Sequence, residues 1–388
     1  MKVVVVTPIP TPYRDAFWNY FSQLQNISLH VIYCAAGKPD RPWKNQWDKQ
    51  YPFTFPKGMN LLSWKSKDAS LYFNPGVLSL LKSTTPDIVL VGGYNHLTMW
   101  MAMIWSFLKG VPFLLMSETR GLRPGRKKDP FLKKLLLRWQ AKSTSGALPT
   151  GCMAEAYLRK YGWKQETLFK FPNVPDIEVL QSQGIQLKQH SVDLKVKWKL
   201  KDEKLILCVG RLIRKKHVDL IIQAFSKVRT PFPLNLIIIG DGDMSNLLKK
   251  QCQQLGIEDR VRFLGFLEAP EMMEWLALAD VFALASNETW GVAPIEAAAA
   301  GTQLLLSNEI GSAKELAALY PATTVISDRK INNWKEAMEN SLKNITLANA
   351  ETTDNTSMSP WYFNALAPGL DQYLNRIIQT AGVIQTPE

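Results

Sequence analysis

The sequence predicts an α/β protein built from two Rossmann-like domains, each with a parallel sheet covered by helices on both faces. Short β-branched runs alternate with helix-length segments along the chain, which is typical of parallel sheets made from βα units. The chain has 388 residues, more than one hydrophobic core usually serves, and 46% of them are hydrophobic against 21% charged. We therefore expect two domains that each bury a core of their own.

The first domain is expected over residues 1–180. Its helix at Leu97–Lys109 should end at Gly110, because glycine tolerates the left-handed backbone of a helix stop. The expected strands are Lys2–Thr7, Ser28–Tyr33, Ile88–Val91, Phe113–Met116, Gly146–Thr150 and Leu168–Phe171.

The second domain is expected over residues 190–360, after the turn-rich stretch Pro172–Asp176 and the polar segment Gln181–Lys201. A final helix near Leu370–Ala381, within residues 361–388, is expected to return to the first domain. The expected strands of the second domain are Leu205–Val209, Leu234–Ile239, Val261–Phe263, Val281–Ala285 and Gln303–Leu306. The expected helices are His217–Lys227, Met244–Leu255, Glu271–Ala279 and Pro294–Ala300.

Several features favour a cytoplasmic protein. The four cysteines are far apart and lack the spacing of a disulfide framework or a zinc site. The segment Met1–Val6 is a predicted strand and lacks the pattern of a signal peptide. The longest apolar run, Leu97–Leu108, is about a dozen residues, whereas a membrane-spanning helix needs about 20.

The positive charge is confined to the first half of the chain. The formal net charge is +12; residues 1–180 have 24 cations against 11 acids, and the remainder has 22 against 23. Nine cations lie within Arg120–Lys142, interleaved with large apolar residues. Such a segment can dock on an anionic membrane surface, or it can be an ordinary amphipathic helix that packs on its own sheet. Nucleic acid is not an expected partner, because no nucleic-acid-binding motif accompanies the charge.

Polar residues follow several predicted strands of the second domain, at the edge where open α/β sheets bind ligands. Gly210 ends the first of these strands and is followed by four cations within six residues. Among them Arg211 offers a planar fork and Lys216 a point charge, which together suit a diphosphate that gains charge as its bond to a sugar breaks. A solvated basic loop is the alternative.

Two further strand ends are less specific. Asp241 and Asp243 resemble a metal-binding pair, but a Gly-Asp-Gly turn needs its glycines for backbone geometry and its acids can cap the next helix. We favour that structural interpretation and expect no metal. Phe266 could lie against a nucleotide base, or it could belong to the core and turn.

The segment Asn287–Ala297 holds two glutamates eight positions apart. Glu288 lies on the loop after a strand, and Glu296 lies in the first turn of a helix opened by Pro294. Glu296 can accept hydrogen bonds from a ribose diol, or it can be a favourable charge at a helix start. Backbone amides near Gly291, Val292 and Ala293 could face an anion at the start of the helix. Trp290, Gly291 and Val292 complete the expected donor-binding set.

Together these residues, from Leu205 to Leu316, resemble the C-terminal domain of retaining family 4 glycosyltransferases of the GT-B fold. The shared elements are Gly-Arg-Leu with a lysine five positions after Arg211, the Gly-Asp-Gly turn, Asp-Arg-Val-Arg-Phe-Leu-Gly, and the two glutamates. The resemblance implies two facing Rossmann-like domains and metal-independent transfer with retention. It implies that Arg211 and Lys216 hold the diphosphate, Glu296 the ribose and Glu288 the transferred sugar. His217 departs from the family, which usually has glycine there.

The first domain resembles the family more loosely. Its first loop, Thr7–Arg14, is rich in proline where many members have glycine, and Arg14 could supply a side-chain cation instead. Glu118 and Arg120 follow a strand and are acceptor-side candidates, although a simple ion pair would explain them equally well. His96, at the start of a helix, is a further candidate, with a capping or core role as the alternative.

The expected function is transfer of a hexosyl group from a UDP- or GDP-sugar to a hydroxyl acceptor, without a cofactor. The basic segment favours a glycolipid or cell-envelope polysaccharide acceptor and a peripheral position on the inner face of the membrane. Transfer to a small soluble acceptor, a nucleotide-sugar epimerase, a glycosyl phosphorylase, and a catalytically silent membrane- or polyanion-binding protein are the alternatives.

Overall fold

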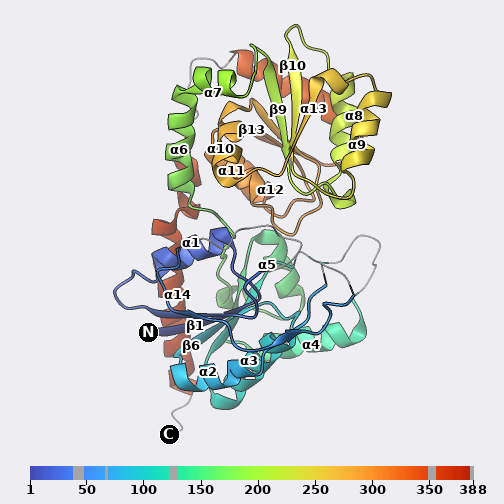
Figure 1. Ribbon diagram of the computed structural model, residues 1–388. Coiled ribbons are helices and arrows are strands. Elements are labelled where there is room, and N and C mark those ends of the chain that lie inside the picture. Colours follow the sequence, from blue (N-terminus) through green and yellow to red (C-terminus); the bar gives the residue numbers. More distant parts are fainter. Residues whose placement is uncertain (38–47, 66–68, 120, 122–128, 348–354, 385–388) are drawn as a thin grey trace. The chain divides into compact units, whose positions relative to one another are not determined.

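The computed structural model describes residues 1–37, 48–65, 69–119, 121, 129–347 and 355–384, and the chain divides into two compact units (Figure 1). The N-terminal unit contains Met1–Pro175 and Trp361–Glu388, and the C-terminal unit contains Asp176–Pro360. Each unit is built around a six-stranded sheet whose neighbouring strands are all parallel. The predicted α/β class is thus confirmed.

The sheet of the N-terminal unit has the order β3-β2-β1-β6-β7-β8. A short antiparallel pair, β4 (Met59–Asn60) and β5 (Tyr72–Phe73), lies outside it. The sheet strands are β1 (Lys2–Thr7), β2 (Ser28–Tyr33), β3 (Phe53–Thr54), β6 (Ile88–Gly92), β7 (Phe113–Ser117) and β8 (Gly146–Pro149). The helices are α1 (Pro12–Phe21), α2 (Gly76–Thr84), α3 (Leu97–Lys109), α4 (Phe131–Ser143), α5 (Cys152–Lys160) and α14 (Phe363–Ile384).

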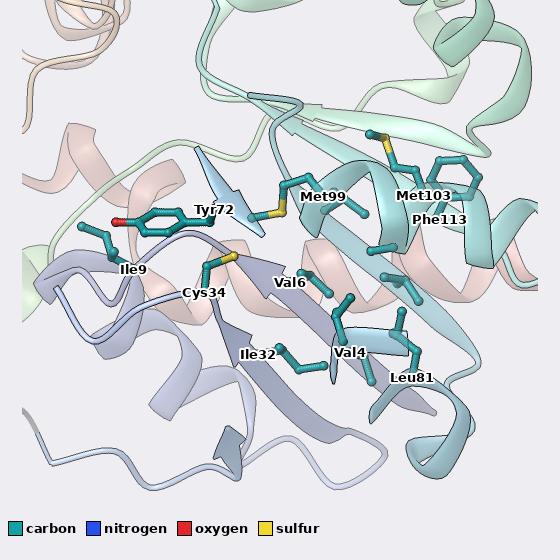
Figure 2. Close-up of a cluster of buried hydrophobic side chains, with 14 residues drawn as sticks. Val4, Val6, Ile9, Ile32, Cys34, Tyr72, Leu81, Met99, Met103 and Phe113 are labelled. Carbon is teal, nitrogen blue, oxygen red and sulfur yellow. The ribbon is translucent and has the colours of Figure 1, made fainter. Parts of the chain in front are cut away.

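The core of the N-terminal unit forms where α2 and α3 cover the central strands. Val4 and Val6 of β1 meet Met99 and Met103 of α3 in one buried cluster (Figure 2). Gly110 ends α3 with a φ of 66°, as predicted. Helix α14 also belongs to this unit, because Phe363 packs edge-on against Phe17 of α1 at a centroid separation of 5.5 Å.

The segment Leu168–Phe171 is not a strand, contrary to expectation. It runs beside β8 and forms one isolated bridge to Ala147, and the amides of Phe169 and Phe171 donate to carbonyls of β8. The bond that would continue the ladder requires an N–H at Pro149, which proline lacks. The pairing therefore stops after one residue.

The sheet of the C-terminal unit has the order β11-β10-β9-β12-β13-β14. The strands are β9 (Lys204–Val209), β10 (Leu234–Ile239), β11 (Val261–Gly265), β12 (Val281–Leu284), β13 (Gln303–Ser307) and β14 (Thr323–Ile326). Two groups of helices cover its faces (Figure 1). One group is α8 (Val218–Lys227), α9 (Ser245–Gln254) and α13 (Ile331–Leu347), and the other is α6 (Ile177–Gln189), α10 (Ala269–Leu278) and α11 (Ala293–Ala299). Helices α7 (Ser191–Lys197) and α12 (Ala313–Leu319) complete the unit.

The polar segment Gln181–Lys201 is mostly helical and lies within α6 and α7. Asp176 caps α6 by accepting a hydrogen bond from the Val179 amide at 3.1 Å. Gly184 lies directly against Ala300, where a Cβ would come within 3.0 Å of the backbone. Helix α6 buries only Ile177 and Gly184, so its sequence lacks the strong apolar stripe that predicts a helix.

Candidate functional site

The candidate site lies in the C-terminal unit where the strand order changes direction. The chain leaves β9 toward β10 on one side, whereas β12 pairs with β9 on the other side. Loops that follow β9 and β12 therefore diverge at this point, which is where open α/β sheets bind ligands. Lys216 follows β9 and Glu288 follows β12.

Lys216 and Glu288 are in direct contact. The ammonium of Lys216 donates to Oε1 of Glu288, and the two side chains are 12% and 21% exposed. A partly buried pair of this kind is sensitive to loss of either partner, because the remaining charge is then uncompensated. The structure thus brings together one cation and one acid that the sequence placed 72 residues apart.

Gly210 makes room for the Lys216 side chain. Its φ is +148°, and a Cβ at this position would lie 3.1 Å from Nζ and 3.3 Å from Cε of Lys216. Lys216 closes a 3₁₀ turn over Arg214–Lys216, after which His217 adopts a left-handed backbone with φ 50° and ψ 40°. Glycine, which the resemblance leads us to expect at this position, would adopt this conformation without strain.

The Gly-Asp-Gly turn holds the loop that carries Arg211. A Cβ on Gly240 would lie 2.1 Å from the Gly210 carbonyl oxygen, and a Cβ on Gly242 would lie 2.5 Å from that of Leu212. The Leu212 amide also donates to the Asp241 carbonyl at 2.9 Å. The glycines therefore serve backbone packing, as favoured above.

The expected capping role of the acids in this turn is not observed. The Asp241 carboxylate accepts from the Gly242 amide at 2.8 Å. Helix α9 starts after Met244 without a side-chain cap. In the described parts of the chain, no group of three or more His, Cys, Asp or Glu side chains is placed to hold a metal ion.

The loop of Glu288 is fixed by a segment that the sequence analysis missed. The Glu288 amide donates to the Glu309 carbonyl at 3.2 Å, and its own carbonyl accepts from the Gly311 amide at 3.1 Å. A Cβ on Gly311 would lie 1.9 Å from the Thr289 carbonyl oxygen. The Ser312 hydroxyl donates to the carbonyls of Trp290 and Gly291. The only sequence signal for this contact is the glycine two residues after Glu309.

A second polar contact ties this segment to the basic loop. The Glu309 carboxylate accepts from the Asn287 amide group and from the Arg329 guanidinium, both at 2.5 Å. The Asn287 backbone amide donates to the Lys215 carbonyl at 3.0 Å. These bonds connect the loops after β9, β12 and β13.

Glu296 lies in the first turn of α11 and is half-buried. Desolvation by burial raises the pKa of this carboxyl from 4.5 to about 7. A carboxyl with such a pKa is poised to become ionised when hydroxyl donors reach it. Helix α11 has only seven residues, so its dipole contributes little to this site.

The remaining expected donor residues differ in their exposure. Trp290 is 3% exposed, so its ring belongs to the core and only its backbone could meet a ligand. Phe266 is 50% exposed and lies on the surface after β11, which excludes the core alternative for its ring. Arg211 is exposed at the end of β9, while Gly291 and Val292 are half-buried.

Candidates in the N-terminal unit form a different kind of cluster. The Arg14 guanidinium donates to the Phe171 carbonyl at 3.0 Å and lies 3.8 Å from the centroid of the Phe171 ring. Burial lowers the pKa of Arg14 to about 10, while Tyr13 and Glu118 oppose this change. Glu118 accepts a bond of 2.6 Å from the Asn173 amide group.

The candidate His96 lies in the core beside Tyr72. His96 is 7% exposed, its Nδ1 accepts from the Tyr72 amide at 3.3 Å, and its ring is 4.8 Å from that of Tyr72. These contacts fit the core role that was the alternative for His96. Arg120 lies outside the described residues.

The architecture is that of the GT-B fold, in which two Rossmann-like units of this topology occur in one chain. Solved structures of glycosyltransferases have the same fold. A glycosyltransferase from Rickettsia africae matches 97% of this chain and 98% of its own with a TM-score of 0.75 at 12% identity. Anabaena HepE in complex with UDP-glucose matches 99% of both chains with a TM-score of 0.63 at 17% identity.

The sequence of the C-terminal unit is similar to a known family. Residues 192–354 match the model of the family Glycosyl transferases group 1. A glycosyltransferase of Methanocaldococcus jannaschii is 38% identical over 30% of each chain. The alpha-monoglucosyldiacylglycerol synthase of Streptococcus pneumoniae is 32% identical over 37% of this chain and 35% of its own. This chain therefore matches only about a third of the length of these relatives.

Proposed function

We propose that this protein transfers a hexosyl group from a UDP- or GDP-sugar to a hydroxyl acceptor, with retention of configuration and without a metal ion. The observation that carries the proposal is the contact of Lys216 with Glu288 at the switch point of the unit that matches the Glycosyl transferases group 1 model. Glu296 lies on the helix that follows Glu288. Lys216, a cation suited to phosphate, thus follows β9, while Glu288 and Glu296, carboxylates suited to sugar hydroxyls, follow the adjacent strand β12.

In the proposed reaction, the bond between the anomeric carbon and the β-phosphate oxygen breaks. The electron pair leaves with the nucleoside diphosphate, whose negative charge increases. Lys216 and Arg211 stabilise this charge. Lys216 is only 12% exposed and is already held by Glu288, so it can do so with little reorganisation. The acceptor oxygen bonds to the same face of the anomeric carbon, and its proton passes to the departing phosphate oxygen. The products are a nucleoside diphosphate and a glycoside.

The two glutamates have separate proposed roles. Glu288 contacts the transferred sugar and holds Lys216 in place before the donor arrives. Glu296 accepts hydrogen bonds from the ribose diol, and these bonds favour its ionised form. Ribose binding would therefore lower a pKa that burial has raised to about 7.

A glycolipid or an envelope polysaccharide is the proposed acceptor class, with the protein acting at the cytoplasmic face. The names of two relatives support it, the alpha-monoglucosyldiacylglycerol synthase and a GDP-mannose-dependent phosphatidylinositol monomannoside mannosyltransferase of Mycobacterium tuberculosis. The latter is 25% identical over 47% of this chain. In the described parts of the chain, no helix could cross a membrane.

The test begins with a thermal-shift series of the full chain against UDP-, GDP- and ADP-sugars with EDTA present. A ligand that binds only the folded state raises Tm by mass action. We expect one nucleotide class to stabilise the wild type and not Lys216→Ala. Transfer of labelled sugar from that donor to extracted lipids then identifies the acceptor. A donor that binds and is epimerised or left unchanged, with lipid and soluble acceptors present, would contradict transfer.

A further inference from the structure

Helix α4 turns most of its large apolar side chains toward solvent. It buries only Leu137 and Gln140. The side chains of Phe131, Leu132, Leu135 and Leu136 are 39–82% exposed. The sequence-based alternative, in which this apolar face packs on its own sheet, therefore does not describe α4.

Helix α3 extends the same exposed surface. Its inner side is buried through residues such as Met99 and Met103 (Figure 2), whereas Ile104, Phe107 and Leu108 are exposed. Trp139 of α4 joins the two helices, because its ring stacks on Trp100 at 5.9 Å and meets Phe107 at 6.1 Å. We call this surface the α3–α4 face.

The charges that α3 and α4 contribute to the α3–α4 face are all positive. Lys134, Arg138 and Lys142 of α4 and Lys109 of α3 are not among the ion pairs of the described residues, and neither helix contains an acidic residue. Asp129, two residues before α4, is 7% exposed and already binds Lys133 and Tyr161. Exposed leucine and phenylalanine flanked by lysine and arginine is the composition of helices that lie in a membrane interface.

A cavity of about 300 Å³ opens between the two helices. Its walls are mainly apolar and include Trp100, Leu132, Leu136 and Leu137, and Lys133 also lines it. Its volume is at the lower end of small-molecule sites, and an apolar site of this size accommodates a stretch of hydrocarbon chain.

We propose that the α3–α4 face docks the N-terminal unit on an anionic lipid bilayer, with one acyl chain entering the cavity between α3 and α4. The exposed apolar side chains enter the interface, and the four cations lie against lipid phosphates. This deepens the proposed function by giving the substrate surface. Vesicle binding requires no nucleotide, so its failure is distinguishable from failure of the transfer reaction.

The first experiment is flotation of the full chain with phosphatidylcholine vesicles, with and without phosphatidylglycerol. The wild type should float only with the anionic vesicles. Replacing Lys134, Arg138 and Lys142 by Gln should weaken partitioning about 100-fold, because each cation near an anionic surface contributes separately. A matched control replaces Lys227, Lys249 and Lys250, three exposed cations of the C-terminal unit, and should bind as the wild type. Equal losses in both triple variants would overturn specific docking.

The apolar part of the face is tested with Phe131→Ser together with Leu135→Ser. Both side chains are exposed, so the fold should persist, and an unchanged Tm would show it. Partitioning should fall at least tenfold in this variant and remain unchanged in a control with Val196→Ser and Leu247→Ser. Absence of vesicle binding, with a dimer that dissociates in the first variant, would assign the face to a second copy of the chain and overturn the proposal.

The cavity is tested with vesicles whose phosphatidylglycerol has brominated acyl chains, which quench nearby indoles. Bound wild type should lose a fluorescence component that is missing in Trp100→Phe. Leu136→Phe narrows the cavity and should reduce this quenching while flotation persists. Unquenched Trp100 in vesicle-bound protein would contradict entry of the chain.

Discussion

The two units of this protein have the same sheet topology but hold their strand-end residues in different ways. In the C-terminal unit, glycines let neighbouring loops touch through their backbones, as Gly240 does with Gly210. Charged side chains then project from a rigid base. In the N-terminal unit, the first loop has prolines, and Arg14 and Glu118 are tied to Phe171 and Asn173. Backbone packing thus fixes the loops of the C-terminal unit and leaves Lys216 and Glu288 to contact each other at the candidate site, whereas Arg14 and Glu118 hold the fold of the N-terminal unit.

The sharpest test of this contrast is Lys216→Ala in the C-terminal unit. We expect kcat/KM for sugar transfer to fall at least about 100-fold, the usual effect of removing one group that stabilises developing charge. Arg214→Ala, on an exposed position of the same turn, is the matched control and should retain activity. Comparable losses in both variants would indicate that the general positive charge of the loop, and not a specific contact of Lys216, supports activity.

Gly240→Ala tests the backbone contact itself. The added Cβ would meet the Gly210 carbonyl oxygen at 2.1 Å, so the free energy of unfolding should fall by about 3 kcal/mol. Gly256→Ala is the matched control, because Gly256 has a φ of +63° and nothing within 4 Å of the added Cβ. That variant should lose only about 1 kcal/mol in a urea titration. Equal losses would mean that positive φ alone explains the glycines.

Glu296 predicts a pH dependence of donor binding. Its pKa of about 7 lies above the ordinary 4.5, so the carboxyl is mostly protonated at pH 6 and mostly ionised at pH 8. If the ribose prefers the ionised form, Kd should be up to about tenfold higher at pH 6. Glu296→Gln should remove this dependence in calorimetric titrations, and Glu258→Gln, at an exposed position, should retain it.

The same pKa shift makes a prediction for stability. Between pH 4.5 and 7 the folded state holds a proton that the unfolded state has released, so stability should fall as the pH rises through this window. The side chain of the Glu296→Gln variant does not titrate, so this variant does not lose stability through this window. Its Tm should therefore exceed that of the wild type at pH 8 but not at pH 4. An equal difference at both pH values would contradict the raised pKa.

Arg14→Ala tests the other side of the comparison. It removes a hydrogen bond and a contact with the Phe171 ring, so unfolding should become easier by about 1 kcal/mol. Nucleotide affinity should not change. Arg159→Ala, an exposed cation on α5, should leave stability unchanged. A loss of nucleotide affinity in Arg14→Ala would instead give Arg14 a role in donor binding.

The smallest expected effect is that of His217→Gly. His217 has a φ of 50°, and this left-handed backbone costs a residue with a side chain roughly 1 kcal/mol. Glycine avoids that cost, but its more flexible unfolded state offsets part of the resulting stabilisation. We expect a net stabilisation of about 0.5 kcal/mol by denaturant titration, with transfer activity retained. A destabilised variant would show that the imidazole makes contacts that outweigh the strain.

Much of the fold was predictable because buried parallel strands have continuous β-branched sequences. Strands β1, β2 and β10 have the bounds that the sequence predicted. Strand β14 was missed, since it has four residues at the edge of its sheet and only one of them is buried. Helix α6 was missed because it buries so little of its surface.

The candidate site was predictable only where one segment carries its own signal. Glycines and charges after β9 and β12 identified Lys216, Glu288 and Glu296. The contact of Glu288 with Glu309 and Gly311 depends on pairing between loops some twenty residues apart, which no local pattern records. The sequence likewise could not tell that the apolar side of α4 faces solvent, because an amphipathic helix has the same pattern whichever neighbour covers it.

The path of the chain has a consequence for biosynthesis. The chain leaves the N-terminal unit after Pro175 and returns to it only at Trp361. Helix α14 then packs Phe363 against Phe17 of α1, and its Tyr373 hydroxyl donates to the Thr167 carbonyl. The whole C-terminal unit is therefore translated while its neighbour still lacks a helix. During that interval Phe17 has no Phe363 to pack against, so a ribosome that stalls before residue 363 would release a chain with one finished unit and one aggregation-prone one.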